Sequence, residues 1–154
     1  MAPATIETYT SLDALRDGHL RQLADYWTAL RGGRVAPAKS EIDPADIAPL
    51  LPYVFFAEAI GLPPDFRFRL AGSHLRDVTG NELTGKLLDE VFPPDFADEV
   101  RVRWRQAIAE VRPLVGRSKL WIKDRQHVNW ESVVLPVTRH GSAIDLLLGG
   151  FAGR

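Results

Sequence analysis

Apolar residues near the N-terminus recur at steps of three and four residues, the spacing of one helix face. This stripe comprises Leu12, Leu15, Leu23, Trp27 and Leu30, with His19 in register. Ser11 is a suitable N-cap ahead of it, and Gly32-Gly33 end it because glycine readily adopts the left-handed conformation at helix C-termini. A second, short helix is predicted from Asp43 to about Leu51, with Pro44 in its first turn.

From residue 53 the period changes to two. Tyr53 to Ile60 is rich in aromatic and branched residues, and large apolar residues alternate with arginine between Phe66 and Leu70. The Gly- and Pro-containing turn between them predicts a hairpin. Polar turns separate three further predicted strands, at about 115–123, 127–138 and 143–152.

Short helices and turns are predicted for residues 73–94. A longer helix is predicted from Asp95 to Val111, ending before Pro113. The order of elements predicts an α+β fold, a five-stranded antiparallel sheet with helices on one face plus an N-terminal helical extension. We expect three parts: a flexible N-terminus (1–10), the helical extension (11–52) and the core domain (53–152).

Both faces of the predicted sheet carry large apolar groups, whereas a half-solvated antiparallel sheet would alternate apolar and polar residues. A second layer must therefore cover the outer face, since an exposed patch of this size marks an interface. We predict that the first helix packs on that face and that a homodimer forms through it. The candidate interface residues are Leu23, Trp27, Leu30, Trp121, Trp130, Val134 and Leu147.

The chain has 154 residues, with 45% apolar and 25% charged residues, which is typical of one globular domain. It contains no cysteine, which excludes disulfides, thiolate metal sites, iron–sulfur clusters and cysteine nucleophiles. The first ten residues lack a signal-peptide pattern, and no apolar run approaches the ~20 residues of a membrane span. These observations predict a cytoplasmic protein without a membrane partner.

The net charge of −1 conceals an asymmetry between the two parts of the chain. Residues 1–100 hold nine basic and sixteen acidic residues, and residues 101–154 hold ten basic and four acidic ones. Such a split can mark a nucleic-acid surface. We favour the interpretation that the two parts fold against each other or pair in a dimer, because the basic residues do not form a block.

Several strings together resemble a bacterial family of short, stand-alone PAS-domain proteins. They are Leu30-Arg31-Gly32-Gly33-Arg34, Ile42-Asp43-Pro44 with Leu51-Pro52, Asp65-Phe66-Arg67-Phe68-Arg69-Leu70-Ala71-Gly72-Ser73, Gly80-Asn81-Glu82-Leu83-Thr84-Gly85 and Leu135-Pro136-Val137. The resemblance implies a sensory or signalling domain that acts through a homodimer or an unidentified signalling partner, with a small-molecule ligand as a further option. Because nothing follows Arg154, we expect output through a surface contact.

The resemblance also implies a cavity between the sheet and the helices, near which Trp104, Trp130 and Phe92 fall; we expect such aromatic residues mainly to fill the core. The candidate lining residues are Leu70, Leu75, Val78, Leu88, Phe92, Val100, Trp104 and Ile122. A turn motif with a structural role is formed by Arg69, Gly72, Ser73, Gly80, Glu82, Thr84 and Gly85.

No catalytic residues, metal site or cofactor are predicted. Haem-binding relatives use a histidine in the helical segment, so His74 is the candidate by position, but we expect it to be satisfied by hydrogen bonds. The flavin adduct of photosensory relatives needs a cysteine, which is absent. A small hydrolase or isomerase stays open as an alternative, although its best residues, His127 and Glu131, would lie about 13 Å apart along a strand. A nucleic-acid-binding protein is the third interpretation.

Overall fold

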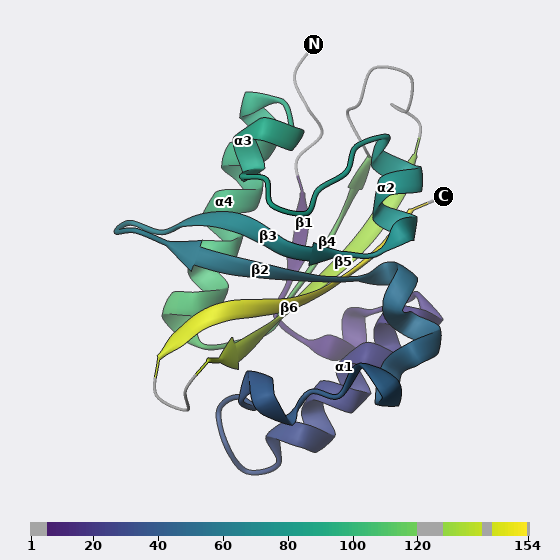
Figure 1. The fold of residues 1–154 in the computed structure, drawn as a ribbon, viewed down its shortest axis with the longest axis vertical. Helices are drawn as coiled ribbons and strands as arrows, with labels where there is room; N and C mark the ends of the chain where they lie inside the picture. The colour runs from purple at the N-terminus through teal and green to yellow at the C-terminus, as the bar shows by residue number, and fades with distance from the viewer. Residues whose placement is uncertain (1–5, 120–127, 140–142, 154) are drawn as a thin grey trace.

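A single antiparallel sheet of six strands organises the structure, a computed structural model that describes residues 6–119, 128–139 and 143–153. The order across the sheet is β1-β4-β5-β6-β2-β3 (Figure 1). The strands are β1 (Glu7–Tyr9), β2 (Val54–Ile60), β3 (Asp65–Ala71), β4 (Leu114–Lys119), β5 (Asn129–Thr138) and β6 (Ile144–Gly153). The predicted α+β class with an N-terminal extension is confirmed, with six strands in place of five.

The additional strand, β1, lies in the segment that we expected to be flexible. It pairs antiparallel with β4, from Glu7 opposite Arg117 to Tyr9 opposite Val115. Ile6, just before it, is only 3% exposed. Three residues are too few to show a period of two in the sequence, so pairing with the β4 edge is what defines this strand.

Helical segments of the N-terminal extension cover one face of the sheet. They are η1 (Leu12–Ala14), α1 (Gly18–Arg31), η2 (Lys39–Glu41) and η3 (Pro44–Tyr53). The first α-helix begins later than predicted: Ser11 caps only the single turn η1, and the carboxylate of Asp17 caps α1 by accepting the N–H groups of His19 and Leu20. Gly32 ends α1 with a positive φ of 58°, as the sequence predicted.

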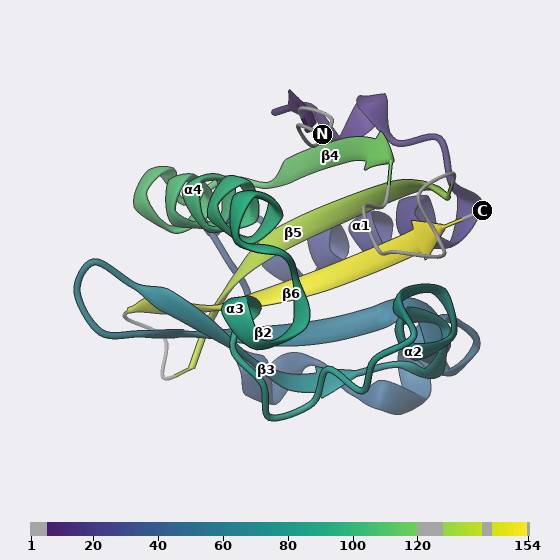
Figure 2. The same ribbon diagram turned by 90° about the horizontal axis from the view of Figure 1, so that it is seen from above.

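The opposite face of the sheet is covered by α2 (Ser73–Thr79), α3 (Leu88–Val91) and α4 (Pro94–Glu110). Figure 2 shows α1 and α4 on opposite sides of the strands. The expectation of helices on one face therefore holds for the core domain alone, because the extension adds a helical layer to the other face. We call the α4 side the inner face and the α1 side the outer face.

Both faces are apolar and buried, as the large apolar residues on both sides of the predicted strands indicated. On the outer face, Val133, Leu135 and Leu148 pack in one cluster with Leu23 and Trp27 of α1. The indole Nε1 of Trp27 also donates to the carbonyl oxygen of Pro136 at 2.8 Å. The first helix therefore covers this face within the same chain.

The predicted interface residues do not form one surface. Trp130, Val134 and Leu147 belong to the inner-face cluster, because a period of two shows which residues share a face but not which layer covers it. Leu23 and Trp27 are each 1% exposed under their own chain, so a homodimer, which stays a prediction, would need another surface. Leu30 is half-buried, and Trp121 lies outside the described residues.

Arginines of the basic C-terminal part pair with acids of the acidic N-terminal part. Arg101 lies 3.2 Å from Asp65 and 2.8 Å from Asp89, and Arg139 lies 2.7 Å from Glu58. These ion pairs support the interpretation that the two parts fold against each other. Among the described residues, no helix has both the length and the apolar character needed to cross a membrane.

A cavity on the inner face

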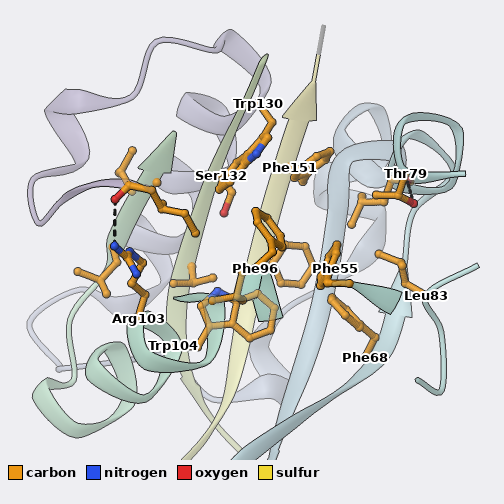
Figure 3. Close-up of a pocket in the computed structure, with 18 of the residues that line it drawn as sticks. Phe55, Phe68, Thr79, Leu83, Phe96, Arg103, Trp104, Trp130, Ser132 and Phe151 are labelled. Atoms are coloured by element: carbon orange, nitrogen blue, oxygen red, sulfur yellow. Dashed lines mark hydrogen bonds between the residues drawn. The ribbon is translucent and has the colours of Figure 1, made fainter. Parts of the chain in front are cut away.

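A cavity of about 60 Å³ lies between the inner face of the sheet and helices α2 to α4 (Figure 3). We call it the inner cavity. On the same scale, one ordered water needs roughly 10–15 Å³, so the cavity is larger than a single water site. Its described wall consists of Ile6, Thr8, Phe55, Phe68, Leu75, Thr79, Leu83, Phe92, Phe96, Val100, Arg103, Trp104, Leu114, Val115, Gly116, Trp130, Ser132, Val134 and Phe151.

Aromatic rings form much of the wall and hold one another in place. The ring of Phe55 stacks on Trp104 with centroids 5.4 Å apart, and Phe68 meets Trp104 edge-on at 5.8 Å. On the other side, Trp130 stacks on Phe151 at 5.9 Å and meets the edge of Phe96 at 5.8 Å. Pairs of this geometry are favourable beyond their buried area, so the wall is pre-organised.

Gly149 of β6 makes room for this arrangement. A Cβ atom built on Gly149 would lie 2.0 Å from Cζ of Phe55, which no real side chain tolerates. Phe55 is itself held between Gly149 and the stacked ring of Trp104. The ring of Phe55 therefore lies flat against β6 only because position 149 has no side chain.

Four polar residues interrupt the apolar wall. The hydroxyl of Thr79 donates to the carbonyl oxygen of Leu75 at 2.7 Å, so it is satisfied within α2. Ser132 brings a second hydroxyl from β5, and Arg103 of α4, with its hydrogen-bond partner Thr8 of β1, completes the polar part of the wall. No histidine or carboxylate belongs to the described wall.

Arg103 of α4 holds β1 against the cavity. Its Nε donates to the hydroxyl of Thr8 at 2.7 Å, and Nη2 donates to the carbonyl oxygen of Ile6 at 3.0 Å. Nη1 donates to the carbonyl oxygen of Glu99 at 3.0 Å, and the carboxylate of Glu99 lies 3.5 Å from Nη2. The N-terminal strand thus forms one wall of the cavity, and one arginine secures it.

One residue of the wall has a buried polar atom without a partner. The indole Nε1 of Trp130 is buried without a hydrogen-bond partner among the described residues. Trp130 as a whole is 7% exposed. Buried indole N–H groups usually find a partner, so this donor calls for an explanation.

The predicted lining residues are brought together in part. Leu75, Phe92, Val100 and Trp104 lie on the wall. Val78 and Leu88 are buried in the inner-face cluster but do not line the cavity, and Ile122 lies outside the described residues. Sequence reasoning missed Phe55, Phe68, Phe96 and Phe151 as lining residues, although alternation placed Phe68, and the apolar face of α4 placed Phe96, on a buried side.

Leu70 is the clear error among the predicted lining residues, because it is 46% exposed. Phe56 pairs with Leu70 but the next residue, Ala57, pairs with Phe68, which leaves Arg69 as an extra residue in β3. Such a bulge turns the following side chains toward the other side of the strand. The regular alternation of residues 66–70 in the sequence could not reveal it.

The glycines of the predicted turn motif have structural roles. Gly80 ends α2 with φ of 77°, and Gly85 has φ of 85°. A Cβ atom at Gly72 would lie 2.2 Å from the carbonyl oxygen of Leu51, so the end of η3 approaches the backbone there. These three positions need glycine for its conformation or its lack of a side chain.

The polar members of the turn motif lie at the surface. The carboxylate of Glu82 accepts the backbone N–H of Thr84 at 3.3 Å, which is the structural role expected for it. This bond is the main reason why the pKa of Glu82 lies below its usual value. Arg69 lies 3.8 Å from Glu58, and Ser73 opens α2 in an exposed position.

His74 does not belong to the wall of the inner cavity. Its Nε2 accepts the backbone N–H of Gly153 at 3.2 Å, and its ring lies beside that of Tyr53, with centroids 4.7 Å apart. Partial burial lowers the pKa of His74, which keeps Nε2 free to accept that bond. Within the described ranges, no group of three or more potential metal-ligating side chains occurs.

Glu131, named for the enzyme alternative, anchors the N-terminal extension. Its carboxylate accepts the backbone N–H groups of Arg16 and Asp17, the shortest at 2.8 Å, and it pairs with Nε of Arg117 at 2.7 Å. Arg117 also donates to the carbonyl oxygen of Ala14. The carboxylate is occupied by these structural contacts, and His127 lies outside the described residues.

The arrangement of the sheet, the short helices and the long α4 has counterparts among known proteins. The model of the PAS domain family matches residues 16–152. The chain belongs to the PAS domain family. The resemblance to PAS domains seen in the sequence is thereby confirmed, and the chain contains a domain of a sensory and signalling type.

Solved structures agree with this fold. One chain from the structure of an RNA-binding light-oxygen-voltage receptor is similar, with a TM-score of 0.57 and 18% sequence identity. The match covers 99% of this chain and 40% of that chain, so the PAS domain described here spans less than half the length of the receptor chain. No match is found among curated proteins.

Proposed function

We propose that this PAS domain is a sensor that binds a small, largely apolar molecule in the inner cavity and signals through protein contacts, without catalysis. The inner cavity carries the proposal. Its wall is aromatic and aliphatic apart from four polar residues, which is the usual composition of a small-molecule site.

The chemistry of the wall favours binding over catalysis. Acid–base catalysis needs a titratable group within reach of the substrate, and nucleophilic catalysis needs a base beside the nucleophile. Among the described residues, the hydroxyls of Ser132, Thr79 and Thr8 share the wall with Arg103 but with no histidine or carboxylate. The described part of the cavity therefore offers a molecule a place to bind, and none of its residues is an acid–base pair or an activated nucleophile.

The N-terminal strand is the proposed route of output. Ile6 and Thr8 of this segment line the cavity, while β1 is only three residues long and forms an edge of the sheet. A ligand that pushes on Ile6 strains the contacts that Arg103 makes with β1. We propose that the loosened or tightened strand changes the surface offered to a signalling partner or to a second copy of this chain.

Binding of fluorobenzene, a small apolar probe, tests this proposal. We expect saturable binding by ¹⁹F NMR to the wild-type protein and to Leu70→Ala, a control at an exposed position off the cavity wall. Ser132→Leu adds volume to the wall, so we expect it to fold, as judged by circular dichroism, and to lose binding. Absence of saturable binding to the wild type, or unchanged binding to a folded Ser132→Leu, would overturn the proposal.

A further inference from the structure

Ser132 of β5 brings to the inner cavity a hydroxyl group that no other described residue binds. Its side chain lies on the same face of β5 as those of Trp130 and Val134, two residues away on either side, and both belong to the inner-face cluster. Figure 3 shows the hydroxyl on this side of the strand, among the aromatic rings of the wall. Ser132 is half-buried and makes no hydrogen bond within the described ranges. Its hydroxyl can therefore bind a ligand without first giving up a bond within the protein.

The hydroxyls of the two threonines on the wall are already in use. Thr79 donates to the carbonyl oxygen of Leu75 at 2.7 Å and also accepts a backbone N–H at 3.2 Å. Thr8 accepts from Nε of Arg103 at 2.7 Å and donates to the carbonyl oxygen of Ile6 at 3.3 Å. A ligand that bound either hydroxyl would have to compete with bonds that hold α2 or β1 in place.

The charge on the wall is also paired. Nη2 of Arg103 lies 3.5 Å from the carboxylate of Glu99, and each of the three guanidinium nitrogens donates to an oxygen. A ligand carboxylate would have to break these contacts or stay unpaired among apolar rings, and burying an unpaired charge costs far more than burying a neutral polar group. The indole nitrogen of Trp130 is buried and offers a ligand no surface. Ser132 is thus the accessible polar side chain of the described wall that has no partner.

We infer that the inner cavity selects a small neutral molecule with an apolar body and one hydroxyl or carbonyl group, which hydrogen-bonds to the hydroxyl of Ser132. Serine suits either group because its hydroxyl both donates and accepts. A second polar group on the ligand would be buried without a partner, which disfavours diols, sugars and nucleobases. The inference rests on the proposed function and specifies the class of molecule that the same cavity takes.

Three benzene derivatives of similar size test the inference. Phenol has a hydroxyl where fluorobenzene has a fluorine atom, and resorcinol adds a second hydroxyl to the ring. We expect phenol to displace fluorobenzene from wild-type protein in ¹⁹F NMR competition. Resorcinol should bind roughly fivefold or more weakly than phenol, because its second hydroxyl gives up its bonds to water without replacement. The comparison of phenol with resorcinol requires no variant.

Ser132→Ala removes the hydroxyl that the inference assigns to the ligand. We expect this variant to bind phenol more weakly relative to fluorobenzene by roughly three- to tenfold, the worth of one hydrogen bond. Thr79→Val is the matched control, because it removes a wall hydroxyl that is bonded within α2. It should keep the wild-type ratio of the two dissociation constants.

The outcomes separate the inference from the proposed function. If phenol fails to displace bound fluorobenzene, if resorcinol binds as tightly as phenol, or if Ser132→Ala keeps the wild-type ratio, the inference is wrong while the proposed function stands. If fluorobenzene itself does not bind to the wild type, the proposed function fails.

Discussion

The two faces of the sheet are both apolar, yet they are built differently. The outer face meets α1 through aliphatic side chains such as Leu20, Leu23 and Leu148, which lie in one closely packed cluster. The inner face meets α4 through aromatic rings such as Phe55 and Trp104, and a cavity remains among them. The same sheet thus has one closely packed face and one face that keeps a cavity, and the second is the face on which we propose binding.

Indole donors show the same contrast. On the outer face, Nε1 of Trp27 donates to the carbonyl oxygen of Pro136 at 2.8 Å. On the inner face, Nε1 of Trp130 has no partner among the described residues. The bond of Trp27 ties α1 to the sheet, whereas the indole of Trp130 makes no comparable tie among the described residues of the inner face.

The largest expected effect is on the outer face. Trp27→Ala should lower the free energy of unfolding by about 3–5 kcal/mol, because it removes a fully buried side chain from between α1 and the sheet. Urea denaturation measures this loss. Val102→Ala, at a position 60% exposed on α4, should change stability by about 0.5 kcal/mol or less. A loss below about 1 kcal/mol for Trp27→Ala would show that α1 is not integral to the fold.

A smaller effect compares adjacent glycines of β6 that face opposite layers. Gly149→Ala places a Cβ atom against the ring of Phe55, which Trp104 holds in place, and should cost about 2–3 kcal/mol. Gly150→Ala meets the methyl ends of Leu20 and Leu23, which can rotate away, and should cost about 1 kcal/mol. Equal costs in urea denaturation would contradict the view that the inner face is the more rigid.

The smallest effect is a dependence of stability on pH through His74, which lies outside both clusters. Burial lowers the pKa of His74 below 6.5, so the folded state binds a proton more weakly than the unfolded state. Its contribution is therefore present above pH 6.5 and is lost as the pH falls through the folded-state pKa. The loss of stability between pH 8 and pH 5.5 should be smaller in His74→Gln than in wild type; an identical loss in both would exclude this role.

The sequence predicted the fold through features that act locally. Alternation, runs of aromatic and branched residues, and polar turns predicted the five core strands, and Gly32 and Asp43-Pro44 marked helix boundaries that the structure retains. The first α-helix begins later in the structure than the sequence predicted. Ser11 and Asp17 are both suitable caps, and only the structure shows that Asp17 caps the long helix. Local signals cannot choose between such equivalent positions.

The cavity was harder to predict because it depends on contacts between distant segments. A period of two grouped Trp130 with Val134 correctly but could not show that this group faces α4. The bulge at Arg69 moved Leu70 off the inner face without any mark in the pattern. The contribution of β1 to the wall depends on Arg103, almost a hundred residues away in the chain, and such a contact has no local signal.

The most direct test of the difference between the faces is the indole N–H spectrum of the protein with and without fluorobenzene. The four tryptophans give four ¹H–¹⁵N signals, which Trp130→Phe and Trp27→Phe assign. We expect the Trp130 signal to shift as the cavity fills, because its ring lines the cavity, while the Trp27 signal, bonded to Pro136 on the outer face, stays in place. A Trp130 signal that does not move at saturation, or a Trp27 signal that moves as far, would contradict the account.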